Sequence, residues 1–292
     1  MFQAVKGYYA YDRTKPLKAV VERPEETASW VHERVTVDAA YGTERLIVHL
    51  FLPREAAPPY QPVIYWPGGG AVVQAVVSPT DGYLAFLIRS GRALVCPVYK
   101  GAFERRVQPP GAAGPWETSL QQAKDLSRCI DYLETRKEDF DLGAIGYFGV
   151  SWGAAEAVRA LAVEDRIKAA VLVDGGLEAY SFERPERDPV HYLPRITIPV
   201  LMLNGRYDAI YPPKVAQEPM FRLLGTDPAR KRYRLTNSGH VTAPTAERIQ
   251  ETVSWFDRYL GPVHRKGGPA FPQRDGPALR RAGPRRARPR GP

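Results

Sequence analysis

The sequence predicts an α/β fold built on a mostly parallel β-sheet that is flanked by helices. Short apolar runs alternate with longer amphipathic segments along most of the 292 residues. Two of the runs, 169–173 and 200–204, are apolar throughout, which is typical of strands buried on both faces. Parallel strands need long crossover connections, usually helices, and the segments between these runs are long enough to supply them.

The first strands are expected to be antiparallel, since 35–37 and 46–52 flank a short turn at 41–43. The remaining elements are assigned from apolar runs and from helical spacing of apolar residues. This gives about eight strands in all, with the later ones at 62–66, 93–98, 145–150, 169–173, 200–204 and 232–235. Helices are predicted at about 118–137, 153–162, 214–224 and 245–260.

Composition divides the chain into three parts. Residues 1–30 are polar and weakly periodic, and we expect them to form an arm lying on the body. Residues 31–262 form the α/β domain, and 175–198, after the sixth strand, have the position and the polar, Tyr-containing composition of a short lid. Residues 263–292 are rich in Pro, Arg and Gly and have too little apolar surface to order themselves, so this tail is expected to be disordered.

The formal net charge of +9 suggests an anionic partner, but the charge is unevenly placed. Nine of the 41 basic residues and only one of the 32 acidic residues follow Leu260, so the folded part is close to neutral. A basic tail can bind nucleic acid through phosphates. The tail has a single aromatic residue, Phe271, so basic and aromatic residues do not alternate in it, and nucleic acid is therefore not the expected partner.

The cysteines and the absence of recognisable targeting signals indicate which sites and locations to expect. Cys96 and Cys129 have no metal-type spacing and are read as small core residues, so neither a metal nor a cofactor is expected. The sequence shows neither a secretory signal pattern at its start nor an apolar stretch of membrane-spanning length. We expect a cytoplasmic protein that does not bind membranes, either monomeric or a homodimer.

The sequence Gly149-Val150-Ser151-Trp152-Gly153 matches the G-x-S-x-G pattern between a predicted strand and a small-residue helix. In that setting a serine occupies a strained turn that exposes its hydroxyl above the sheet, and the glycines allow neighbouring backbone to pass closely. Ser151 is therefore the candidate nucleophile.

A serine hydroxyl needs a base to accept its proton, and the base needs an acid to orient it. Among the five histidines, only His240 follows a late predicted strand, in Thr236-Asn237-Ser238-Gly239-His240. Asp208 follows the strand that ends at Asn204 and is the expected acid. Asp174, at the end of the preceding strand, is an alternative.

Negative charge on a substrate carbonyl oxygen must be met by backbone N–H donors. One is expected from Trp152, the residue after the nucleophile. The other is expected from the glycine run after the third strand, Gly68-Gly69-Gly70, with Gly69 as the donor and Gly70 as the second choice. These glycines do not have the spacing of a phosphate-binding loop.

Together these residues resemble the α/β-hydrolase superfamily, and within it the dienelactone hydrolase and acetyl-xylan-esterase-like branch, including hydrolase domains attached to some bacterial serine/threonine kinases. The resemblance spans about 35–260 and is carried by four segments: 65–70, 146–153, 199–208 and 238–240. It implies an eight-stranded, mostly parallel sheet and cofactor-free hydrolysis through an acyl-enzyme. It also implies that Ser151 is the nucleophile, Asp208 the acid and His240 the base.

Two features depart from relatives in this superfamily. Dienelactone hydrolases proper have a cysteine where this chain has Ser151. The loop after the third strand reads Pro67-Gly68-Gly69-Gly70 in place of the His-Gly-Gly-Gly of the hormone-sensitive-lipase branch.

The expected activity is hydrolysis of short-chain, small-molecule acyl esters by a two-step transfer through Ser151. Tyr207, Tyr211 and Tyr180 are candidates to line a substrate pocket, with core or lid packing as the alternative role. A peptidase or a C–C bond hydrolase would use the same three residues. A binding module that uses the basic tail for nucleic acid is the alternative from a different class.

Overall fold

The computed structural model describes residues 2–79, 84–106, 114–177, 186, 188–240 and 245–266. A ten-stranded sheet runs through it with the order β1-β3-β4-β6-β5-β7-β8-β9-β10, and β2 pairs with β3 beside β1. The α/β prediction is confirmed. The sheet has more than the eight expected strands because β1 (Val20–Val21) and β2 (Glu25–Glu26) extend its edge. A two-residue strand carries no periodicity that a sequence could reveal.

The antiparallel part of the sheet begins with β3 (Trp30–Asp38) and β4 (Arg45–Pro53), which pair along their whole lengths. Strand β4 then pairs antiparallel with β6 (Ala93–Pro97). The predicted strand pair around the turn at 41–43 is therefore present. The first strand of the pair, β3, is longer than the predicted 35–37, because it begins at Trp30.

The parallel part of the sheet carries the candidate site. Strand β5 (Pro62–Trp66) lies between β6 and β7 (Gly146–Val150), followed by β8 (Ala169–Val173), β9 (Val200–Gly205) and β10 (Lys231–Thr236). All neighbouring strands here run parallel, so their carboxyl ends meet at one edge. Strands β6 to β9 are buried throughout, as their continuous apolar runs predict.

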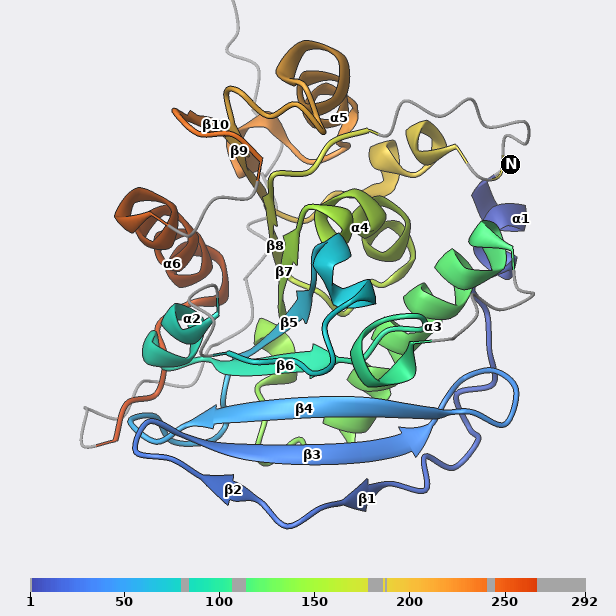
Figure 1. Ribbon diagram of the computed structural model, residues 1–292, viewed down its shortest axis with the longest axis vertical. Coiled ribbons are helices and arrows are strands. Elements are labelled where there is room, and N and C mark those ends of the chain that lie inside the picture. The colour runs from blue at the N-terminus through green and yellow to red at the C-terminus, as the bar shows by residue number, and fades with distance from the viewer. Residues whose placement is uncertain are drawn as a thin grey trace, which may run out of the picture.

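Helices cover both faces of the sheet (Figure 1). Helices α2 (Ala85–Arg89) and α6 (Ala246–Leu260) lie on one face, and α3 (Pro115–Glu134) and α4 (Trp152–Val163) on the other. The helix predicted at 214–224 is a π-helical turn, Pro213–Gln217, that continues into α5 (Glu218–Leu223). Helix α2 was not predicted, since five residues are too few to show a helical period.

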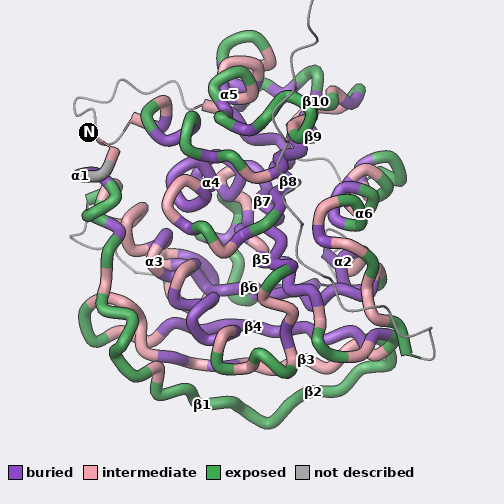
Figure 2. Tube along the Cα trace, turned by 180° about the vertical axis from the view of Figure 1, so that it is seen from behind, coloured by how far each residue is buried: buried purple, intermediate pink, exposed green. Residues whose placement is uncertain are grey.

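The core follows the sheet. Figure 2 shows the buried residues concentrated along the central strands and α4, while β1 and β2 at the edge are exposed. Within the described chain, no helix is both long and apolar enough to span a membrane. The described residues also include no group of three or more His, Cys, Asp or Glu side chains placed to hold a metal ion.

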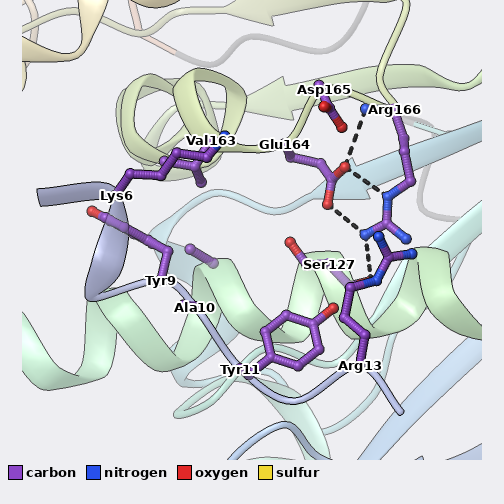
Figure 3. A pocket seen from close by; sticks show the side chains of 11 residues that line it. Lys6, Tyr9, Ala10, Tyr11, Arg13, Ser127, Val163, Glu164, Asp165 and Arg166 are labelled. Atoms are coloured by element: carbon purple, nitrogen blue, oxygen red, sulfur yellow. Dashed lines mark hydrogen bonds and ion pairs between the residues drawn. The ribbon is translucent and has the colours of Figure 1, made fainter. Parts of the chain in front are cut away.

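The N-terminal arm starts with α1 (Phe2–Gly7) and is attached to the body by aromatic and ionic contacts. The Tyr9 ring meets Tyr192 edge-on at 6.1 Å, and the Tyr11 hydroxyl donates to Asp131 at 2.7 Å. A cavity of about 280 Å³ lies along this seam (Figure 3). Arg166 beside it is bound to Glu164 at 2.6 Å and to Asp131 at 2.7 Å, so this cluster fastens the arm to α3 and the end of α4.

The segment predicted as a lid is described only in part, because 178–185 and 187 lie outside the described residues. Residues 188–198 pack into the body, with Tyr192, Leu193 and Ile196 buried in the core. Whether 175–198 acts as a lid stays a prediction. In the predicted tail, 263–266 are described, and Arg265 forms a bridge with Ala56, so the packed part of the chain extends at least to Lys266.

Candidate active site

Ser151 lies in the sharp turn between β7 and α4. Its backbone has φ 52° and ψ −110°, a conformation that L-residues rarely adopt. The Ser151 N–H donates to the Val173 carbonyl of the neighbouring strand at 2.8 Å, which holds the turn at the edge of the sheet. Ser151 is 8% exposed, and backbone strain of this kind is typical of a functional position. The prediction of a strand–Ser–helix turn is confirmed.

The two glycines of the motif are needed because backbone passes the turn closely. A Cβ at Gly153 would lie 2.2 Å from the Trp66 carbonyl oxygen, and one at Gly149 would lie 2.7 Å from the Gly153 carbonyl oxygen. The Tyr147 hydroxyl donates to that same Gly153 carbonyl at 2.6 Å. No other residue type fits these two positions unless the backbone moves.

The structure brings the three predicted residues of the triad into one chain of hydrogen bonds. The Ser151 Oγ lies 2.7 Å from Nε2 of His240, although 89 positions separate them in the sequence. The other ring nitrogen, Nδ1, lies 2.8 Å from Oδ2 of Asp208. Hydroxyl, imidazole and carboxylate are thus aligned as nucleophile, base and acid would need to be.

The loop after β9 fixes the Asp208 carboxylate. Its side chain is fully buried, and Oδ1 accepts backbone N–H bonds from Ile210 and Tyr211, both at 2.9 Å. Oδ2 is left to face His240, whose side chain is 22% exposed. The Asp208 carboxylate therefore has a single orientation, while the His240 ring stays partly open to solvent.

Asp174, the alternative acid, is engaged elsewhere. It follows β8 with φ 49°, and its carboxylate forms an ion pair with Arg248 of α6 at 2.6 Å. Its Oδ1 also accepts the Gly205 N–H at 2.7 Å. Of the two candidate carboxylates, Asp208 is therefore the one bonded to the histidine.

The predicted oxyanion donors begin two helical turns. Trp152 is the first residue of α4, and Gly69 and Gly70 begin the 3₁₀ turn η1 (Gly69–Val72). Backbone N–H groups in the first turn of a helix have no intrahelical acceptor and are available to a ligand. Gly68, which the sequence did not single out, is packed against Ser151: a Cβ there would lie 3.4 Å from the Ser151 Cβ.

The three tyrosines predicted to line a pocket differ in their placement. The Tyr211 ring lies 5.8 Å from the His240 ring and is buried. Tyr207 is 70% exposed on the loop that carries Asp208. Tyr180 lies outside the described residues. The prediction of a tyrosine-lined pocket remains untested.

A cavity of about 260 Å³ lies beside the Ser151 turn and was not predicted. Val150, Gly68 and Gly70 line it close to Ser151, and Val77, Leu84 and Phe103 also contribute. The lining combines residues from β5 to the end of β7 that are far apart in the chain. Nothing in their local sequence pattern could have indicated that they meet.

Solved esterase structures share this fold. The chain superposes on an acetyl xylan esterase from Paenibacillus sp. R4 with a TM-score of 0.65 at 20% identity, over 88% of this chain and 93% of that one. For acetyl xylan esterase 1 from Thermoanaerobacterium sp. JW/SL YS485 the TM-score is 0.66 at 13% identity, over 87% and 92%. For a cold-adapted esterase from an Arctic intertidal metagenomic library it is 0.62 at 20% identity, over 81% and 97%.

Comparisons by sequence return nothing, since no family model and no curated protein matches this chain. The identities to the solved structures are low enough that the likeness concerns the fold alone. Sheet order, the strand–Ser–helix turn and these superpositions together identify the chain as having the α/β-hydrolase fold.

Proposed function

We propose that this protein is a serine carboxylesterase that hydrolyses short-chain acyl esters. The observation that carries the proposal is the continuous hydrogen-bond chain from Ser151 through His240 to Asp208 at the carboxyl edge of the sheet. The likeness to solved esterases supports the same reaction class.

In this mechanism Ser151 Oγ attacks the ester carbonyl while His240 Nε2 accepts its proton. The tetrahedral intermediate collapses when His240 returns that proton to the leaving alcohol, which leaves an acyl group on the serine. Water then attacks the acyl-enzyme with the same histidine as base, and the acid is released. Asp208 keeps the ring in one tautomer and stabilises the imidazolium.

Charge on the carbonyl oxygen is met by backbone donors. We assign these to the N–H groups of Trp152 and Gly69, with Gly70 as the second choice in the loop. The close packing of Gly68 on Ser151 supports the assignment, because it places the start of this loop beside the reacting oxygen. Loss of one such donor typically costs about 3 kcal/mol of transition-state stabilisation.

Small esters fit the site best. The cavity beside the nucleophile, about 260 Å³, is below the range of roughly 300–1,000 Å³ that holds drug-sized ligands. Two of the compared structures are acetyl xylan esterases, so acetyl esters belong at the head of the substrates to test. A peptidase or a C–C bond hydrolase would use the same triad, and amide and β-diketone substrates distinguish them.

Labelling with a fluorophosphonate tests the nucleophile directly. The native protein should be labelled and Ser151→Ala should not. Ser29→Ala is the control: Ser29 is exposed and remote from Ser151 in the sequence, so this variant should be labelled like the native protein. A series of p-nitrophenyl esters from acetate to octanoate should show turnover that is greatest for the short acyl groups. Equal labelling of Ser151→Ala and native protein would exclude Ser151 as the nucleophile.

A further inference from the structure

The cavity beside Ser151 lies on the loop side of the nucleophile. A Cβ at Gly68 would be 4.0 Å from the Ser151 Oγ, and both Gly68 and the adjacent Val150 line the cavity. Its described lining residues fall between Tyr65 and Val150, and none belongs to 205–240, the segment that carries Asp208 and His240. The cavity therefore adjoins the Ser151 turn through Gly68 and Val150, and its described lining takes nothing from the loops that carry Asp208 and His240.

This side determines which part of an ester the cavity would receive. His240 Nε2 must reach the leaving oxygen to protonate it, so the alcohol lies on the histidine side of the serine. Tyr207 and Ile210 flank Asp208 in sequence and are 70% and 64% exposed, so the loop that carries the acid is open to solvent here. The acyl group, which stays bonded to Ser151, points the other way.

Phe103 is the most constrained residue of the lining. It is buried, and it begins the 3₁₀ turn η2 (Phe103–Arg105) with a φ of 44°, which a phenylalanine rarely adopts. A residue stays in such a conformation only where its surroundings hold it there. The two residues that follow it supply that restraint.

The two residues after Phe103 are anchored by buried groups. Glu104 is bonded to His49 Nε2 at 2.7 Å, and this histidine is 4% exposed. Arg105 is paired with the fully buried Asp125 at 2.7 Å and donates to the Val98 carbonyl at 2.9 Å. The backbone under the Phe103 ring is therefore fixed from two directions.

A hydrogen bond joins the end of η2 to the loop that precedes Val77 and Leu84, the other apolar lining residues. The Arg106 Nη1 donates to the carbonyl of Val73 at 2.7 Å, four positions before Val77. Val77 and Leu84, like Phe103, are buried and line the cavity. The size of the cavity is consequently set by a preformed arrangement.

We infer that this cavity holds the acyl chain of the substrate and that Phe103 limits the chain length it accepts. The inference rests on the proposed esterase function and specifies its substrate: esters of small acids with a variable alcohol. A shape-restricted apolar pocket discriminates by roughly 10- to 200-fold per methylene.

Two variants change the cavity in opposite directions. Phe103→Ala enlarges it and should raise kcat/KM for p-nitrophenyl hexanoate relative to acetate by about tenfold over the native ratio. Val77→Phe fills it and should lower the butanoate-to-acetate ratio by about tenfold. Phe140→Ala, which truncates an equally buried phenylalanine outside this lining, is the matched control and should keep the native ratio.

A second series keeps the acyl group as acetate and varies the alcohol from methyl to benzyl. Its profile should be the same in the native protein, Phe103→Ala and Val77→Phe. A shift in the alcohol series, or native acyl ratios in a folded Val77→Phe protein, would overturn the inference even if Phe103→Ala does not fold. Failure of the proposed function is distinguishable, since the native protein would then hydrolyse no ester and bind no fluorophosphonate.

Discussion

Arg248 and Asp174 form a doubly bonded ion pair inside the domain, with Nη1 to Oδ2 at 2.6 Å and Nη2 to Oδ1 at 3.0 Å. Their side chains are 3% and 0% exposed. Asp174 also accepts the Gly205 N–H at 2.7 Å, and Arg248 bonds the Ser238 hydroxyl at 3.0 Å. The pair therefore joins the ends of β8, β9 and β10, from which the loops bearing Asp208 and His240 emerge.

Removal of one member of this pair should destabilise the protein. Arg248→Met leaves the Asp174 carboxylate buried without its counter-charge, which typically costs about 3–5 kcal/mol. Urea unfolding measures the loss. The double variant Arg248→Met/Asp174→Asn should recover part of it, because no uncompensated charge remains. An Arg248→Met protein as stable as the native one would show that the pair does not hold these loops together.

Replacement of the two carboxylates should separate their roles. Asp208→Asn keeps the shape of the loop but removes the charge behind His240, and kcat should fall about 10⁴-fold. Asp174→Asn should lower the free energy of unfolding, while the molecules that stay folded should keep nearly native kcat. Ester hydrolysis normalised to the folded fraction measures both. A low kcat in Asp174→Asn with native activity in Asp208→Asn would reverse the assignment.

The strands and the nucleophile turn were predictable because their signals are local. A run such as 169–173 is apolar throughout, and G-x-S-x-G needs five adjacent residues. No local signal in the sequence distinguishes Asp174 from Asp208 as the partner of His240. Both follow late strands, and what separates them is Arg248, which lies 74 positions beyond Asp174 and pairs with it in the folded state.

The cavity beside Ser151 was even harder to predict from the sequence. Phe103 lies in a segment with no strong period, and its place beside the nucleophile depends on Glu104 and Arg105 reaching partners on other elements. Likewise, the edge strands β1 and β2 are too short to carry a pattern. Contacts between remote segments, rather than propensities, decide these features.

Acidification should weaken the fold through His32. Its ring stacks on Phe51 at 4.5 Å and lies 2.9 Å from the His49 ring nitrogen. Burial is the main reason that the pKa of His32 is lowered from 6.5; a charge on His49 acts in the same direction, while Glu25 and Glu104 oppose it. The unfolded chain thus binds the proton more readily, and stability is lost as pH falls from about 6.5 to the lowered pKa.

The measurement is Tm between pH 8 and pH 5.5. Glu104 stays ionised over this range, because its pKa is lowered: burial raises that pKa, but the hydrogen bond to His49 outweighs burial together with other contacts. His32→Gln does not titrate and should show a smaller fall in Tm over this range than the native protein. Parallel pH curves for the two proteins would mean that His32 does not contribute.

The two cysteines should be unreactive in the native protein. Cys96 and Cys129 are buried, and burial raises the pKa of both thiols. The thiolate is the reactive form, so a thiol reagent such as DTNB should titrate no groups at pH 8 in buffer and both in denaturant. Rapid reaction of one thiol in buffer would indicate an opening of the sheet near β6 or of α3.

Removal of the basic tail should spare ester turnover if the cut is placed after Lys266. The Gln61 amide donates to the carbonyls of Leu260, Gly261 and Pro262 at 3.0–3.1 Å, and Arg265 bridges to Ala56, so a cut at Gly261 would remove packed structure.

A chain of residues 1–266 keeps all of these contacts and should match the full chain in Tm and kcat/KM. It lacks seven of the basic residues of the tail. If the tail binds nucleic acid, the full chain alone should bind a DNA duplex, and the affinity should fall steeply with salt. Loss of ester turnover in the shortened chain would instead assign the tail to the enzyme itself, because every described residue of the site is retained.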